Sequence, residues 1–328
     1  MRPIATLLAL AGLVGVSASC AGPEPDPPAD RVEASADTAS APDLLATNAF
    51  YYYRDVEAAA AFYQDILGFE TVADLGFARI VRVAPTSYLT LVDETRGSHS
   101  AEEPKSVTLA IVTEQVEGWW TYLAEREVPM RAPLGEVEPG RPHDGFVAID
   151  PEGYLLEFER FNPHAENVDL IPLLTEIEPL GPAGGSRPAD LTVQGTVLWL
   201  YYRDIPAMQR FWERLLGADL LVDQGWAKVY QASRTGFVGL VDGERGLHRA
   251  TDQKAVTVSF FSSDTEAWRE WTRLQGLEVR DDALGAVEDG GSSWIAYDPE
   301  GYSVEWVTFC DAVGNERVFQ LLEAEAGR

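Results

Sequence analysis

A glutamate follows a tight turn at two places in the chain, and these two glutamates are the first candidates for chemistry. The segments run from Asp150 to Glu157 and from Asp298 to Glu305, and both begin Asp-Pro-Glu-Gly-Tyr. Proline fixes φ and glycine accepts a positive φ, so the pattern predicts a turn. The alternating residues after it predict a half-buried strand. A carboxylate on such a strand can act as a general base or contact a cationic ligand, or it can be a remnant that a neighbouring hydroxyl satisfies.

Histidines are the next candidates, and the chain has four of them. His99 and His248 occupy matching positions, because each follows Arg-Gly-x, whereas His143 and His164 have no such counterparts. The matched pair can cap loop carbonyls or lie at the mouth of a binding site. No Ser-His-Asp pattern, phosphate loop, Cys-x-x-Cys pair or nucleotide fingerprint stands out.

The matching positions belong to a long internal repeat. Segments 52–55 and 201–204 both read Tyr-Tyr-Arg-Asp, and 204 − 55 = 149. Other shared patterns recur at the same or nearly the same distance. We therefore expect two copies of one domain, residues 44–179 and 191–327, joined by a flexible Gly- and Pro-rich linker at 180–190.

Each copy is expected to contain two βαβββ modules. In the first copy the patterns predict helices at 56–67 and 116–126. They predict strands at 47–53, 70–74, 77–83, 88–93 and 107–112, with three more that end at 154–160. The fold class is therefore α+β, with curved mixed sheets that carry helices on their outer faces.

These residues resemble the vicinal oxygen chelate superfamily, which includes glyoxalase I, extradiol dioxygenases, and fosfomycin and bleomycin resistance proteins. The resemblance rests on Arg54-Asp55, on Phe62-Tyr63 followed by Leu67-Gly68-Phe69, on the turn-to-glutamate segments, and on their second-copy equivalents. It implies that two modules close into a cup-shaped sheet. It also implies a metal site built from the first, fourth, fifth and eighth strands of each cup.

The places that the resemblance assigns to metal ligands are poorly filled here. In the first copy they hold Asn48, Thr90, Thr108 and Glu157, and in the second they hold Val197, Gly239, Thr257 and Glu305. A divalent ion at neutral pH needs several imidazole or carboxylate ligands. We therefore expect no metal and no other cofactor.

Strand alternation predicts which side chains face into each cup. The first strands contribute Asn48, Phe50 and Tyr52 in one copy and Val197, Trp199 and Tyr201 in the other. The expected cup therefore holds aromatic rings, hydroxyls and a carboxylate, which suits a small organic ligand. The alternative is a second core in which the aromatic rings pack only on one another.

The N-terminus reads as an export signal. Residues 1–20 have a short basic start, an apolar run too short to span a membrane, and small residues before Cys20. They resemble a bacterial lipoprotein signal, in which Cys20 would be lipidated, and plain secretion is the alternative. Residues 21–43 are expected to form a disordered tether. Lipidation at Cys20 would place the protein in the cell envelope, in the outer-membrane leaflet facing the periplasm.

The acidic composition limits which binding partners the protein can have. The formal net charge is −28 and the pI about 4.4, which opposes binding to nucleic acid or anionic lipid through electrostatics. We expect a monomer whose partners are a small molecule and, through Cys20, the membrane.

The sequence leaves three functions open. The first is a metal-free binding protein, as bleomycin resistance proteins are in this superfamily. The second is a lyase or dioxygenase with unusual metal ligands, and the third is a structural protein of the envelope.

Overall fold

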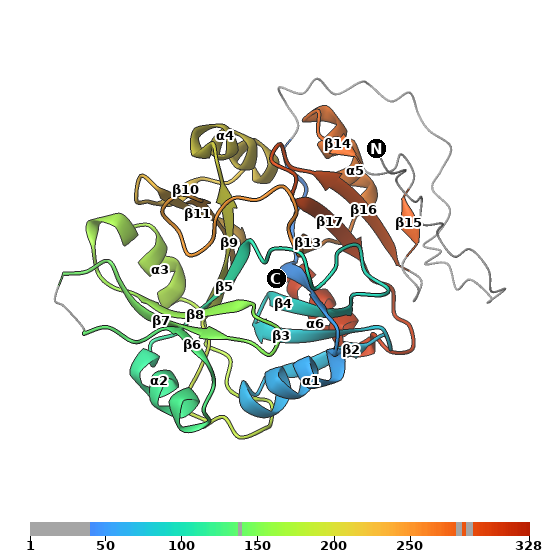
Figure 1. Ribbon diagram of the computed structural model, residues 1–328. Helices are drawn as coiled ribbons and strands as arrows, with labels where there is room; N and C mark the ends of the chain where they lie inside the picture. The colour runs from blue at the N-terminus through green and yellow to red at the C-terminus, as the bar shows by residue number, and fades with distance from the viewer. Residues whose placement is uncertain (1–39, 137–139, 280–283, 287–290) are drawn as a thin grey trace, which may run out of the picture.

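The computed structural model describes residues 40–136, 140–279, 284–286 and 291–328. The predicted signal, Cys20 and nearly all of the tether lie outside these residues. Two large mixed sheets dominate the molecule (Figure 1). None of the described helices is long and apolar enough to cross a membrane.

The first sheet has the strand order β14-β16-β17-β13-β1-β4-β3-β2, with β15 paired to β16. Its strands are β1 (Ala46–Tyr53), β2 (Glu70–Asp74), β3 (Ala78–Ala84), β4 (Ser87–Asp93), β13 (Val256–Phe261), β14 (Glu278–Val279), β15 (Gly285–Ala286), β16 (Ser292–Tyr297) and β17 (Ser303–Thr308). We call its concave side cup 1.

The second sheet has the order β10-β11-β12-β9-β5-β8-β7-β6. Its strands are β5 (Val107–Val112), β6 (Met130–Ala132), β7 (His143–Ile149), β8 (Leu155–Phe161), β9 (Gly195–Tyr202), β10 (Leu220–Asp223), β11 (Ala227–Ser233) and β12 (Gly236–Asp242). We call its concave side cup 2.

Each sheet combines one module from each copy of the repeat. Strand β1 of the first copy pairs antiparallel with β13 of the second, and β5 pairs in the same way with β9. The α+β fold with two cups is confirmed, but the expectation that each copy closes its own cup is wrong. Alternation along a strand specifies which face is buried, and it does not specify which of two equivalent modules lies alongside.

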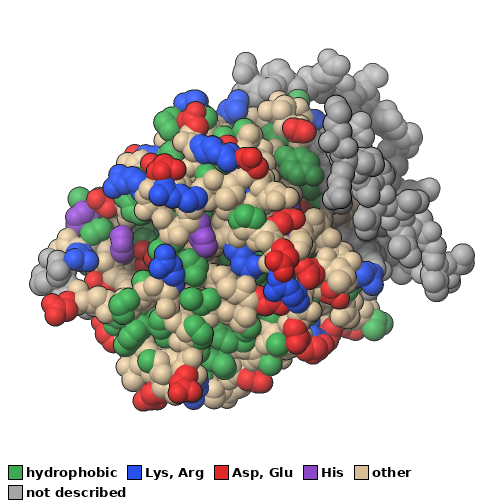
Figure 2. Space-filling model, in the orientation of Figure 1, with side chains coloured by type: hydrophobic (Ala, Val, Ile, Leu, Met, Phe, Trp, Pro, Cys, Tyr) green, Lys and Arg blue, Asp and Glu red, His purple; other side chains and the backbone are tan. Residues whose placement is uncertain are grey.

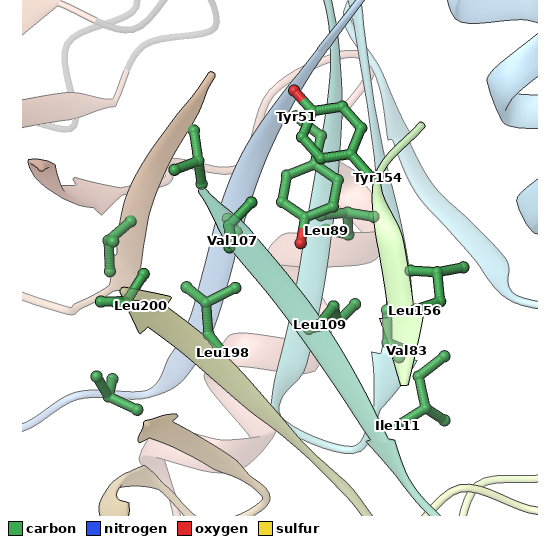
Figure 3. Packing of buried hydrophobic residues seen from close by; sticks show 14 of the residues in the cluster. Tyr51, Val83, Leu89, Val107, Leu109, Ile111, Tyr154, Leu156, Leu198 and Leu200 are labelled. Atoms are coloured by element: carbon green, nitrogen blue, oxygen red, sulfur yellow. The ribbon is translucent and has the colours of Figure 1, made fainter. Parts of the chain in front are cut away.

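The junction between copies is apolar on its buried side. Figure 3 shows Val107 and Leu109 of β5 beside Leu198 and Leu200 of β9. These side chains belong to one continuous buried cluster that contains residues of both copies. Burial of such side chains contributes about 1.5–3 kcal/mol each, so the exchanged pairing is a major part of the core.

Helices cover the outer faces and also close one end of each cup. The outer helices are α1 (Val56–Ala61) with its π-helical continuation η1 (Phe62–Ile66), α2 (Val116–Glu125), α4 (Ile205–Leu216) and α5 (Thr265–Leu274). The short η2 (Ala165–Asn167) and α3 (Leu170–Thr175) follow β8, and α6 (Glu316–Ala326) ends the chain. Leucines of α3 pack on the concave side of cup 2, and Val318 and Leu322 of α6 pack in cup 1.

The Asp-Pro-Glu-Gly-Tyr turns brace the ends of the strands. Asp150 is buried and accepts hydrogen bonds from the Tyr53 hydroxyl at 2.7 Å, the Tyr63 hydroxyl at 3.2 Å and the Tyr154 backbone N–H at 2.8 Å. Asp298 accepts from the Tyr202 hydroxyl at 2.7 Å. Burial raises the pKa of Asp298 to about 6, and its hydrogen bonds oppose that rise.

The tyrosine of each turn ties the two sheets together. The Tyr154 hydroxyl accepts from the N–H of Tyr52 at 2.9 Å and donates to the carbonyl of Ala255 at 2.6 Å. In the second copy the Tyr302 hydroxyl donates in the same way to Ser106 at 2.5 Å. Each tyrosine therefore connects its own strand to the junction at which the other sheet exchanges modules.

The segment between the copies packs against the first copy. The guanidinium of Arg187 is buried and donates to the Leu67 carbonyl at 3.0 Å, and Ser186 N–H donates to the Asp65 carbonyl at 2.8 Å. Arg187 also lies over the rings of Phe69 and Trp119. These contacts hold the Gly-rich linker against the end of η1.

Exchange of modules leads to a testable expectation for separated copies. Residues 44–179 and 191–327, expressed apart, should not form stable monomers, because each leaves its central strand edges unpaired. Mixed together, they should form a one-to-one complex with native near-ultraviolet circular dichroism. Light scattering after size-exclusion chromatography checks both points, and a monomeric copy that unfolds cooperatively would contradict the exchange.

Candidate functional site

Cup 1 encloses a cavity of about 290 Å³. Its walls carry aromatic and aliphatic side chains from both copies, and polar groups from β4, β13, β16 and β17 face it as well. The lining includes Phe50, Tyr52, Phe77, Ile80, Thr90, Val92, Arg96, Thr257, Phe261, Ser293, Ser303, Glu305, Val307 and Phe309. Pockets of this size with few polar groups are typical of small-molecule sites.

The polar groups of cup 1 lie deep in the sheet. Thr90 Oγ1 donates to Asn48 Oδ1 at 3.0 Å, and the hydroxyls of Tyr52 and Thr257 share a hydrogen bond of 2.7 Å. Glu305 is only 9% exposed. The amide nitrogen Asn48 Nδ2 is buried and has no hydrogen-bond partner within the described part of the chain. A buried donor without a hydrogen-bond partner lowers the stability of the folded state. The Asn48 amide is therefore able to make a further hydrogen bond.

Module exchange regroups the predicted site residues. Cup 1 holds Asn48, Phe50, Tyr52 and Thr90 of the first copy with Thr257 and Glu305 of the second. Cup 2 holds Thr108 and Glu157 of the first copy with Val197, Trp199 and Tyr201 of the second. Each residue faces the concave side, as alternation predicts. The residues predicted for one copy are nevertheless divided between the two cups, because the central strand pairs join different copies.

The regrouped residues do not fit the metal site that the superfamily resemblance implies. Cup 1 offers Asn48, Thr90, Thr257 and Glu305 at the four places, so one carboxylate stands beside an amide and two hydroxyls. Cup 2 offers one carboxylate, one hydroxyl, a valine and a glycine. Among the residues described, no group of three or more His, Cys, Asp or Glu is placed to hold a metal ion. These donor sets are too poor for a divalent ion.

Cup 2 is largely filled by its own side chains. Trp199 lies over Gly239, where an added Cβ would overlap the indole ring. The Tyr201 hydroxyl and Thr108 Oγ1 share a hydrogen bond of 2.8 Å, and α3 packs against the same cluster. A cavity of about 70 Å³ is left at its edge. The alternative of a filled cup therefore holds for most of cup 2 and not for cup 1.

Two carboxylates meet this small cavity, Glu157 and Glu159. Burial raises the pKa of Glu157 to about 7, and the indole of Trp199 partly opposes that rise. Burial and the neighbouring charge of Glu157 raise the pKa of Glu159. Burial therefore opposes ionisation of both carboxylates at once.

The Arg-Gly-x-His loops form the rims of the cups. Gly97 lies directly on the ring of Tyr52, since an added Cβ would be 2.5 Å from it, and Arg96 lies over Phe77. His99 contacts Tyr52 edge to face and its Nδ1 is 2.8 Å from Glu103. The second copy repeats the contacts of this loop with aromatic rings.

In that copy Gly246 lies on Tyr201, Arg245 lies over Trp226, and His248 contacts Tyr201. Burial lowers the pKa of His248 to about 4. The recurrence of the motif therefore has a packing reason at the cup mouths.

Several lining residues were missed from the sequence. Phe261 lies two residues after Ser259 on the face of Thr257, so the alternation rule could have found it. Phe77 and Phe309 lie just outside strands and His143 begins β7, and their positions relative to the cups depend on the tertiary fold. No local signal identifies them.

The raised pKa of Glu157 predicts a pH dependence of stability. Because the folded-state pKa of about 7 exceeds the ordinary 4.5, the contribution is complete below about pH 4.5 and is lost as pH rises through about 7. Glu157→Gln should therefore increase the free energy of unfolding at pH 8, by up to about 3 kcal/mol, and have little effect near pH 5. Urea titrations at several pH values measure this, with exposed Glu114→Gln as the control. Equal pH profiles for the wild type and Glu157→Gln would contradict it.

Comparison with known proteins agrees with this geometry. Residues 46–158 match the family model of the Glyoxalase/Bleomycin resistance protein/Dioxygenase superfamily. No curated protein matches the chain. Glyoxalase I from Zea mays has a TM-score of 0.55 at 16% identity, over 87% of this chain and 97% of that chain. A "putative dioxygenase" from Bacillus subtilis has a TM-score of 0.61 at 13% identity, over 82% and 86%.

At these identities the structural matches concern the fold alone. They span both cups, whereas the family match lies in the first copy. The family match therefore concerns residues 46–158, and the structural matches show that the chain as a whole has the fold of these proteins.

Proposed function

We propose that this protein binds a small organic molecule in cup 1 without a metal ion. The observation that supports the proposal most is the cavity of about 290 Å³, in which aromatic rings surround a buried carboxylate. Cup 2 lacks a cavity of this size. The protein therefore has one principal site, built by both copies of the repeat.

The walls favour a ligand with a flat or compact apolar body. Phe50, Tyr52, Phe77, Phe261 and Phe309 all line the cavity. Aromatic side chains supply large contact areas and accept rings in stacked or edge-to-face arrangements. Tyr52 is held by its hydrogen bond to Thr257 and by Gly97, so part of the wall is rigid before a ligand binds.

The charges favour a cationic group on that ligand. Glu305 lines the deep part of the cavity, on the β17 strand. Arg96 lies at the rim, where its guanidinium is 5.1 Å from the Phe77 ring centroid. A positively charged nitrogen near Glu305 would gain from the carboxylate and from the faces of the aromatic rings.

Phenyltrimethylammonium and its neutral isostere tert-butylbenzene test this proposal. Thermal shift and titration calorimetry on the purified full chain should detect both, with tighter binding of the cation. Glu305→Gln should weaken the cation at least tenfold, which corresponds to about 1.4 kcal/mol, and leave the neutral probe unchanged. Glu157→Gln, the equivalent change in cup 2, is the matched control.

A chelator should change neither affinity. Loss of the cation preference in both variants, or equal weakening of both probes by Glu305→Gln, would refute the role of Glu305. Absence of binding by either probe would refute an open cup 1.

We further propose that Cys20 anchors the protein in the cell envelope. The support is the export signal in residues 1–20 and the small residues before this cysteine. Growth of a bacterial host with an alkyne-labelled fatty acid should label the full chain and place it in the membrane fraction. Cys20→Ala should lose the label and leave the membrane fraction, and a labelled Cys20→Ala protein would contradict the assignment.

A further inference from the structure

The small cavity of cup 2 is lined by groups that cup 1 lacks. It has about 70 Å³ and lies between the β7–β8 edge, the turn before β11 and the Arg-Gly-x-His loop of the second copy. Its polar lining includes His143, Glu157 and Glu159, and its rings include Trp199, Tyr201 and Trp226. Of these six residues, only Glu157 and Tyr201 have a residue of the same type at the equivalent position of cup 1, namely Glu305 and Tyr52.

Two acceptor atoms of this lining, and the donor Trp199 Nε1, have no hydrogen-bond partner among the described residues. Glu159 is 3% exposed, and its Oε2 meets no donor. His143 Nδ1 is likewise without a partner and lies 3.9 Å from Glu159 Oε1. Buried polar groups are normally satisfied, and exceptions call for a bound group. Both atoms can accept a hydrogen bond, since a carboxylate and a neutral imidazole carry free lone pairs.

The spacing of the two carboxylates suits one small guest. Glu157 and Glu159 are two residues apart on one face of β8, so their Cα atoms are about 6.6 Å apart along the strand. One nitrogen between them can donate to both at about 2.8 Å. Gly145 lies opposite Glu159 on β7, where the two strands approach closely, since an added Cβ would be 2.6 Å from the Phe158 carbonyl oxygen.

The chemistry of the lining selects the guest. Two carboxylates and an imidazole nitrogen outnumber the one indole N–H of Trp199, so acceptors predominate and favour a guest that donates hydrogen bonds. A positive guest would favour the ionised form of the two carboxylates, which burial alone disfavours, and the rings of Trp199, Tyr201 and Trp226 favour a cation as well. A divalent metal fits less well, because no three such ligands within the described ranges are close enough to share an ion.

We infer that cup 2 holds a second binding site, for a small ammonium ion such as ammonium itself or methylammonium. The cavity has room for a guest of a few heavy atoms, so a ligand that fits cup 1 is excluded from it. This site is independent of the proposed function of cup 1, since its lining shares no residue with that cavity.

Thermal shift and calorimetry on the full chain at constant ionic strength test the inference. Ammonium and methylammonium chloride should raise the melting temperature in a saturable way, whereas sodium and tetramethylammonium chloride should not. Glu159→Gln should reduce the methylammonium affinity at least tenfold. Trp226→Leu, at the edge of the cavity, is a second variant in case the buried change disturbs folding.

Glu305→Gln, the counterpart of Glu157 in cup 1, should leave methylammonium binding as it is in the wild type. An equal rise with sodium, or unchanged methylammonium binding in both Glu159→Gln and Trp226→Leu, would overturn the site. Displacement of methylammonium by stoichiometric Mn²⁺ or Zn²⁺, lost in Glu159→Gln, would overturn the assignment of the guest and replace it with a metal.

Discussion

The pairing of β1 with β13 and of β5 with β9 is the interaction on which both cups depend. Each pair joins a module of one copy to a module of the other at the centre of a sheet. Each central strand pairs on one side within its own copy and on the other side across copies, so neither cup exists within one copy alone. The buried hydroxyls of Tyr154 and Tyr302 reinforce the same junctions from the neighbouring sheet.

The two cups have the same fold and differ in volume at one pair of adjacent positions on neighbouring strands. In cup 1 Phe50 pairs in register with Thr90, and in cup 2 Trp199 pairs with Gly239. The larger indole needs the glycine beneath it and occupies the space that remains open above Phe50. The two cavities, about 290 and 70 Å³, therefore follow from a local exchange of volume and not from a change of fold.

The charged surface places few limits on either cup. Figure 2 shows acidic and basic side chains interspersed over one face of the molecule, despite the net charge of −28. The interior groups of the cups are the ones from which we argue selectivity. Glu305 in cup 1 and the pair Glu157 and Glu159 in cup 2 make both interiors acceptor-rich, which is why cationic guests are proposed for each.

The sequence by itself determined the repeat, the α+β class, the order of the elements and the concave face of each strand. Predicted strands such as 70–74 and 107–112 agree with β2 and β5 to the residue, and the helix predicted at 56–67 matches α1 with η1. These features are local, because turn chemistry and side-chain periodicity act over a few residues. Glu305, Thr257 and Tyr52 were identified as facing a cup for the same reason.

Only the tertiary structure decided which modules pair, which cup is open and which groups meet in it. The two copies have the same alternation of buried and exposed side chains, so their strands offer β1 equivalent edges to pair with. The partner of β1 is therefore determined by packing across the whole molecule. The space above Trp199 depends on a glycine on another strand, and the meeting of His143 with Glu159 depends on the register of β7 with β8. Such contacts join residues far apart in the chain, and no periodicity within a segment encodes them.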